Sequence, residues 1–203
     1  MTQTNSRITI SYYLDDQGVM LVGWQNIDDY WYYFAESGEM QTGWIKVGPC
    51  WYYLGENGEM QTGRLQVNGD WYYLNEGGSM RIGWLQLGNC WYYLTESGRM
   101  QTGWLKLGDC WYYLYADGAM ATGWLNLNGN WYYMRPSGAM AVGWCLVGNN
   151  WYYMAESGVM VTGWLNLNGT WYYMGNDGAM LTGTHTINGN TYVFNQDGVW
   201  ISD

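Results

Sequence analysis

Aromatic side chains recur through this chain at a spacing that could build ligand-binding cages. A Trp-Tyr-Tyr triplet begins every 20 residues, as at Trp31 and Trp51, and a Gly-Trp pair and a Met recur in step, as at Trp44 and Met40. Aromatic ring faces attract cations, and they bind quaternary ammonium groups especially well. Such a group has no N–H to donate, so its site needs no polar acceptor. The pattern therefore favours a quaternary ammonium ligand.

Two other uses of the aromatic residues compete with this one. Carbohydrate binding by stacking on aromatic rings normally also requires hydrogen-bonding groups around the sugar, as in glucan-binding repeats. The recurring positions here are aromatic, Met and Gly rather than Asn, Asp or Arg. A purely structural spacer would explain the repeats but not an aromatic face left over for contact, which usually marks a binding surface. Glucan binding therefore stays as the alternative.

Candidate catalytic and metal-binding groups are sparse. The single histidine, His185, lies in a degenerate end repeat, where we expect it to be exposed. Surface charge, rather than acid catalysis, is the better explanation for the acids that recur near one turn, Glu36, Glu56, Glu76, Glu96 and Glu156. Free thiols are expected at positions without metal-motif spacing, Cys50, Cys90, Cys110 and Cys145. We therefore expect no enzyme activity, no cofactor and no metal.

Composition narrows the partners further. The net charge of −10 opposes binding to phosphate backbones, so no nucleic acid is expected, and it favours a cationic ligand. No apolar run is long enough to span a bilayer, so no membrane insertion is expected. Residues 1–10 lack the features of a secretion signal.

The elements that must position the aromatics are β-hairpins. Trp-Tyr-Tyr-Phe at 31–34 has strand propensity, and the following Glu-Ser-Gly is typical of a turn. A two-residue turn at Ser37-Gly38 would place Trp31 opposite Trp44, although a longer turn would shift this register. The Tyr32 and Phe34 face would then fill the interior. Since one hairpin is marginal alone, the sequence predicts an all-β solenoid of about ten tandem 20-residue hairpins.

The segments Gly-Trp-Leu-Lys-Leu-Gly-Asp-Cys-Trp-Tyr-Tyr-Leu at 103–114 and Asp-Gly-Ala-Met-Ala-Thr-Gly-Trp at 117–124 resemble the choline-binding repeat of bacterial cell-wall-binding proteins. The resemblance covers nearly the whole chain. It implies a left-handed superhelix with choline groups of teichoic acids boxed between successive hairpins by two Trp, a Tyr and often a Met. The expected partner is choline or phosphocholine on cell-wall teichoic acid, and the resemblance implies a location that is secreted or on the bacterial cell surface.

The resemblance implies six complete choline boxes. In each, two Trp thirteen residues apart combine with the second Tyr of the next triplet and a later Met, with the first Tyr as the alternative. The sets are Trp31, Trp44, Tyr53 and Met60; Trp71, Trp84, Tyr93 and Met100; Trp91, Trp104, Tyr113 and Met120; Trp111, Trp124, Tyr133 and Met140; Trp131, Trp144, Tyr153 and Met160; and Trp151, Trp164, Tyr173 and Met180.

Departures from the repeat should remove boxes and mark the ends. Ser11 should break the site of Trp24, Arg64 that of Trp51, and Thr184 that of Trp171. Residues 1–203 are expected to form a single repeat domain, with an atypical N-terminal cap at 1–22 and an atypical C-terminal cap hairpin at 184–203. An exposed terminal hairpin could pair with a second copy, which leaves a homodimer open.

Overall fold

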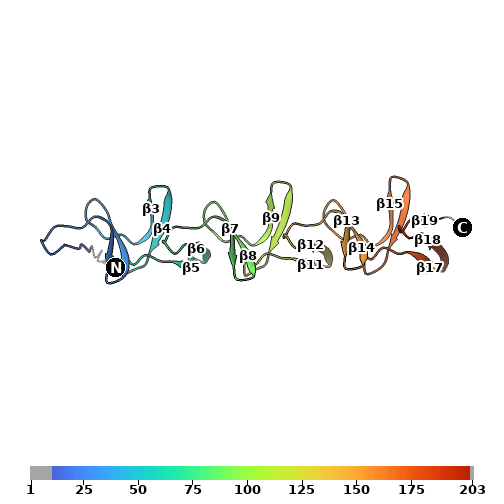
Figure 1. Cartoon of the computed structure of the whole chain (residues 1–203), viewed down its shortest axis with the longest axis horizontal. Coiled ribbons are helices and arrows are strands. Elements are labelled where there is room, and N and C mark those ends of the chain that lie inside the picture. Colours follow the sequence, from blue (N-terminus) through green and yellow to red (C-terminus); the bar gives the residue numbers. More distant parts are fainter. Residues whose placement is uncertain (1–10, 202–203) are drawn as a thin grey trace, which may run out of the picture. The chain divides into compact units, whose positions relative to one another are not determined.

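The fold is a succession of short two-stranded antiparallel hairpins, which a computed structural model describes for residues 11–201 (Figure 1). No helix occurs in that range, and therefore none that could cross a membrane. The chain divides into two compact units, residues 1–101 and 102–203, each described here by itself.

Within residues 11–101, the first unit contains four hairpins. They are formed by β1 (Gly23–Ile27) with β2 (Tyr30–Phe34), β3 (Gly43–Val47) with β4 (Cys50–Leu54), β5 (Gly63–Val67) with β6 (Asp70–Leu74), and β7 (Gly83–Leu87) with β8 (Cys90–Leu94).

The second unit contains five hairpins. They are formed by β9 (Gly103–Leu107) with β10 (Cys110–Leu114), β11 (Gly123–Leu127) with β12 (Asn130–Met134), β13 (Gly143–Val147) with β14 (Asn150–Met154), β15 (Gly163–Leu167) with β16 (Thr170–Met174), and β17 (Gly183–Ile187) with β18 (Asn190–Phe194). A short strand, β19 (Trp200–Ile201), pairs with β18 and extends the last hairpin to three strands.

Each hairpin closes through a two-residue turn just before the Trp-Tyr-Tyr triplet. In β5–β6 the turn is Asn68-Gly69, and both residues have positive φ, 52° and 90°. This is the signature of a type I′ turn, whose twist matches that of the flanking strands. Where the turn begins with glycine, as at Gly48, only that glycine has positive φ, as in a type II′ turn.

The predicted hairpin turn at Ser37-Gly38 is therefore wrong, and so is the register that followed from it. Trp31 lies opposite Asn26, and Trp44 lies opposite Tyr53. The Ser-Gly segment does form a tight turn, in which the Gly38 N–H donates to the Ala35 carbonyl at 2.8 Å, but this turn connects one hairpin to the next. Asn-Gly dipeptides such as Asn68-Gly69 form the turns within hairpins, because Asn and Gly both tolerate positive φ.

The last residue of each second strand forms the core, as predicted for the face of Phe34. These side chains are at most 2% exposed: Phe34, Leu54, Leu74, Leu94, Leu114, Met134, Met154, Met174 and Phe194. Successive hairpins are also joined through the backbone. For example, the Met60 N–H donates to the Trp31 carbonyl at 2.7 Å. The connection that follows β3–β4 is thus fixed to β2 of the hairpin one further back.

The expected N-terminal cap lies partly outside the described residues, as does the expected absence of a secretion signal in residues 1–10. Within the described part of that cap, an isolated bridge joins Leu14 to Met20. The proposed C-terminal cap corresponds to β17, β18 and β19, again with its last two residues outside the described range.

Candidate functional site

A pair of tryptophans on one face of each complete hairpin forms two walls of a cage. In β3 and β4, Trp44 lies opposite Tyr53 and Lys46 lies opposite Trp51, which puts both Trp side chains on the same face. In six hairpins within residues 11–201, the two rings of the Trp pair are nearly perpendicular. Their interplanar angles are 82–90°, and their centroids lie 6.0–6.5 Å apart. Two perpendicular walls leave a corner open to a ligand.

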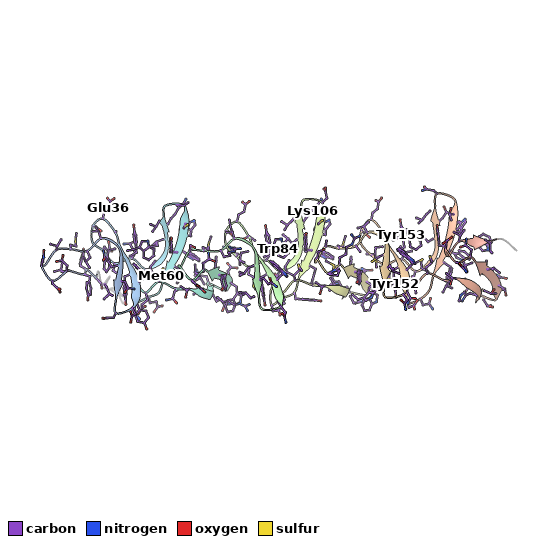
Figure 2. All side chains as sticks on the ribbon, in the orientation of Figure 1. Glu36, Met60, Trp84, Lys106, Tyr152 and Tyr153 are labelled. Carbon is purple, nitrogen blue, oxygen red and sulfur yellow. The ribbon has the colours of Figure 1, made fainter. Side chains whose placement is uncertain are left out.

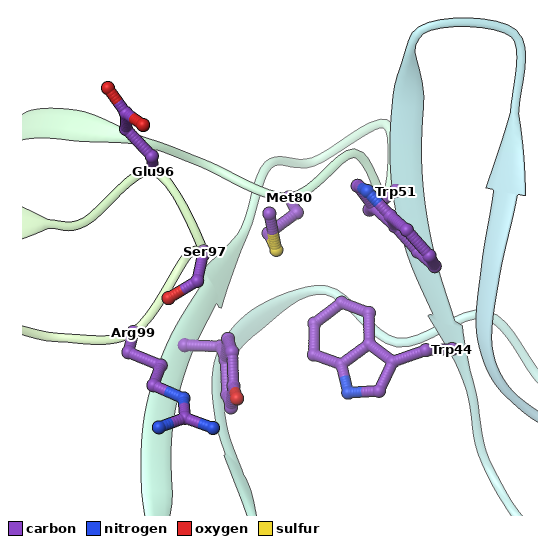
Figure 3. Close-up of a pocket in the computed structure, with 7 residues that line it drawn as sticks. Trp44, Trp51, Met80, Glu96, Ser97 and Arg99 are labelled. Carbon is purple, nitrogen blue, oxygen red and sulfur yellow. The ribbon is translucent and has the colours of Figure 1, made fainter.

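The first Tyr of the next triplet supplies the third wall. Tyr72 on β6 faces Trp44 with ring centroids 4.8 Å apart, and the equivalent contacts in other repeats span 4.7–5.1 Å. Met80, from the segment after β6, lines the same cavity (Figure 3). The cage therefore exists only where two consecutive hairpins stack.

Four open cavities of this kind, each with a volume of about 340–370 Å³, lie within residues 11–201. We name them by their first residue. Their aromatic and Met walls are Trp44, Trp51, Tyr72 and Met80; Trp104, Trp111, Tyr132 and Met140; Trp124, Trp131, Tyr152 and Met160; and Trp144, Trp151, Tyr172 and Met180.

The structure corrects the grouping of the six predicted boxes. Trp residues seven positions apart share a cavity, not those thirteen apart, because the two-residue turn lies between them. Trp104 thus lines a cavity with Trp111, Tyr132 and Met140 instead of with Trp91, Tyr113 and Met120. The same shift regroups the sets predicted around Trp31, Trp71, Trp111, Trp131 and Trp151.

The second Tyr of each triplet was the wrong choice for the cavity wall. Tyr152 and Tyr153 are neighbours on β14 and point to opposite faces (Figure 2). Tyr152 lines the same cavity as the preceding Trp pair, Trp124 and Trp131. The second Tyr instead packs edge-on against the Trp of its own hairpin at 5.1–5.2 Å: Tyr53, Tyr93, Tyr113, Tyr133, Tyr153 and Tyr173. It lies on the same face of the hairpin as the Trp pair and packs against the first of the two Trp rings.

Ser11 and Arg64 also do not remove the sites that they were expected to remove. Trp24 pairs with Trp31 and contacts Tyr52, so Ser11 breaks no site there. Trp51 lies in an open cavity, and the residue that shares a site with Arg64 is Trp71.

At the C-terminal end, Thr184 does not remove the Trp171 site. Trp171 pairs with Trp164, which contacts both Tyr192 and Trp200. Trp200 stands 20 residues after Met180, at the repeat position of the Met. This spacing could have revealed Trp200 as a fourth aromatic wall.

An acidic side chain lies at each of the four open cavities, which sequence reasoning missed. It comes from the turn two hairpins further along the chain: Glu96, Glu156, Asp177 and Asp197 for the Trp44, Trp104, Trp124 and Trp144 cavities. A carboxylate beside an aromatic cage favours a cationic occupant. The Trp44 cavity is also lined by Arg99, whose charge opposes that of Glu96, whereas no cation from residues 11–201 lines the other three. Glu96 and Glu156, which were interpreted as surface charge alone, therefore also shape the electrostatics of a site.

Tyr52 and Tyr112, which occupy the first-Tyr position of their repeats, remain neutral. Burial raises the pKa of Tyr52 above its ordinary value of 10.0, and the neighbouring Cys50 raises it further; the same two causes raise the pKa of Tyr112. The ring therefore interacts with a cation through its π face.

The remaining reactive side chains form no centre within residues 11–201. No group of three His, Cys, Asp or Glu side chains is placed to hold a metal there. His185 is half-buried rather than exposed as expected, and its Nε2 lies 2.9 Å from the Thr182 carbonyl oxygen. The four cysteines are free, as expected.

Fold and site together define a class of tandem-hairpin protein with aromatic cages between consecutive hairpins. The choline-binding repeat matches residues 21–64, 41–84, 81–121, 102–144 and 141–184, and the chain belongs to this family. No curated protein sequence matches the chain.

Three solved structures of Streptococcus pneumoniae proteins are similar to it. CbpJ is 40% identical, with a TM-score of 0.84, over 94% of this chain and 75% of CbpJ. Choline binding protein F, in the presence of a peptidoglycan analogue, is 34% identical, with a TM-score of 0.77, over 94% and 83%. The choline-binding domain of CbpL is 31% identical, with a TM-score of 0.66, over 90% and 98%.

Proposed function

We propose that this chain is a non-catalytic module that attaches to choline residues of bacterial cell-wall teichoic acids at the cell surface. The observation that carries the proposal is the set of open cavities, each walled by two Trp, one Tyr and one Met and bordered by a carboxylate. Cation–π attraction and apolar contact in such a cage suit a trimethylammonium group.

Several cages on one chain act together on a polymer. Each cation–π contact contributes about 0.5–2 kcal/mol, so a single site is weak. Once one site is occupied, a polymer that carries many choline groups presents the next group at high effective concentration. We therefore expect weak binding of free choline and strong retention on a choline-bearing surface.

Retention on choline-substituted agarose tests the proposal. The protein should bind at physiological salt and elute with free choline, whereas ethanolamine, a primary amine that is more strongly hydrated, should elute it poorly. Binding to a glucan resin combined with flow-through on the choline resin would overturn the proposal. A homodimer through the terminal hairpin stays a prediction, which sedimentation velocity of the free protein measures.

A further inference from the structure

One aromatic site in the first unit contains a cation that belongs to the chain itself. Arg64 on β5 pairs with Tyr73, as Trp44 on β3 pairs with Tyr53, so Arg64 stands at the repeat position of the first Trp. It shares a site with Trp71, and we name this the Arg64 site.

The guanidinium group of Arg64 lies among the walls of that site. Its carbon is 4.5 Å from the ring centroid of Trp71 and 5.9 Å from that of Tyr92, both within cation–π range. Nη2 lies 3.8 Å from Sδ of Met100. Trp71, Tyr92 and Met100 correspond to Trp51, Tyr72 and Met80 of the Trp44 site, so the guanidinium contacts three of the four usual walls.

The guanidinium also occupies the space that a ligand would need. The cavity of the Arg64 site is about 10 Å³, against about 340–370 Å³ for the four open ones. Trp71 is half-buried. Its counterparts at the same repeat position are 39–45% exposed: Trp31, Trp51, Trp91, Trp111, Trp131, Trp151 and Trp171.

We propose that Arg64 is the resident cation of this site and that it holds the β5–β6 and β7–β8 hairpins together without external ligand. Because the guanidinium is attached to the site, its effective concentration there far exceeds that of a free ligand. An incoming ammonium group would meet both a filled cavity and a like charge. The site is therefore closed to choline. It fixes the contact between these two hairpins, whereas hairpin contacts at the open cavities gain stability from bound ligand.

Two backbone hydrogen bonds report on this difference. The Met100 N–H donates to the Trp71 carbonyl at 2.7 Å across the Arg64 site, and the Met80 N–H donates to the Trp51 carbonyl at 2.7 Å across the Trp44 site. The two hydrogen bonds have the same length, and the two amides occupy the same position in the repeat. The adjacent cages differ in that Arg64 stands at the position of Trp44.

Residue-resolved amide hydrogen exchange of the full chain, with and without choline, tests the proposal. In the wild type, choline at saturation should slow exchange at Met80 at least tenfold and leave Met100 within twofold. Arg64→Gln should speed exchange at Met100 at least fivefold and leave Met80 unchanged. Arg135→Gln, which makes the same charge change at an exposed position in the other unit, should alter neither amide.

The inference rests on the proposed function, and the two fail differently. If choline does not protect Met80, the proposed function fails. If choline protects Met80 and Met100 equally, or if Arg64→Gln leaves Met100 unchanged, the resident-cation proposal is overturned while choline binding stands. Arg64→Trp is the second variant and should open the site. Choline should then slow amide exchange at Met100 tenfold or more. If choline left the exchange rate of Met100 unchanged in this variant, that result would also contradict the proposal.

Discussion

Trp104 and Tyr132 belong to consecutive hairpins, and their ring centroids lie 5.1 Å apart at an interplanar angle of 66°. The cage that they line is therefore a property of the stack and not of one hairpin. A ligand held there contacts both hairpins, so binding and stacking must stabilise each other.

Removing the third wall of one cage should weaken that cage alone. Tyr132→Leu should raise the dissociation constant of the Trp104 site about fivefold, equivalent to about 1 kcal/mol, because one π face is lost. The indole N–H resonances of Trp104 and Trp111 during a choline titration measure this. Tyr132→Phe keeps the ring and should bind within about twofold of the wild type. Equal loss in both variants would mean that the hydroxyl, not the ring, holds the ligand.

The turn glycines should matter for ligand binding through the methionines. A Cβ at Gly158 would overlap Sδ of Met140, whereas a Cβ at Gly163 would meet nothing within 4 Å, and the two φ angles are +82° and +81°. Alanine at either position should cost about 1 kcal/mol of folding free energy from positive φ.

Only Gly158→Ala should also displace Met140 and weaken choline binding at the Trp104 site. Thermal unfolding and the indole titration together separate the two effects. The account of the Met wall would be wrong if Gly163→Ala weakened this site as much as Gly158→Ala does.

The carboxylate at each open cavity should contribute a salt-dependent part of the affinity. Glu156→Gln should weaken choline binding at the Trp104 site about twofold at low ionic strength, since exposed charge pairs contribute about 0–1 kcal/mol. The difference should shrink at higher salt. Glu36→Gln makes the same charge change at an exposed turn that lines none of the four open cavities (Figure 2). It should leave the indole titration unchanged at every salt concentration.

Cysteine reactivity should follow burial. Burial raises the pKa of the Cys145 thiol, and Cys145 packs in the core with Ala141 and Met154, whereas Cys90 is exposed. At pH 8 less of the Cys145 thiol is ionised, so its alkylation should be on the order of tenfold slower than that of Cys90. Timed alkylation with peptide mass spectrometry gives both rates, and equal rates would contradict the packing of Cys145.

Much of the fold could be predicted because the period of 20 residues has no insertion, so that one hairpin describes nearly all of them. The register was wrong because two turn signals compete within each repeat. Asn68-Gly69 is a stronger hairpin signal than Ser37-Gly38, since both of its residues accept the positive φ of a type I′ turn. Comparing the two dipeptides would have placed Trp44 and Trp51 on one hairpin.

The residue types of the cage were predictable, but their grouping was not. Side chains alternate along a strand whatever the turn, but the third wall comes from the face of the next hairpin that does not carry its own Trp pair, so Tyr133 was predicted where Tyr132 lines the cavity. The acidic residues near the cavities come from two hairpins away, and no local pattern shows that proximity. The same register determines the role of Arg64, because the register decides whether Arg64 lies beside Trp51 or beside Trp71.

A crystal structure of the full chain with bound choline tests the central claim most directly. We predict an ammonium group enclosed by Trp104, Trp111, Tyr132 and Met140, equivalent groups in the other open cavities, and none in the Arg64 site. Choline bound between Trp91 and Trp104 beside Tyr113, or choline that displaces the Arg64 guanidinium from Trp71, would contradict the account.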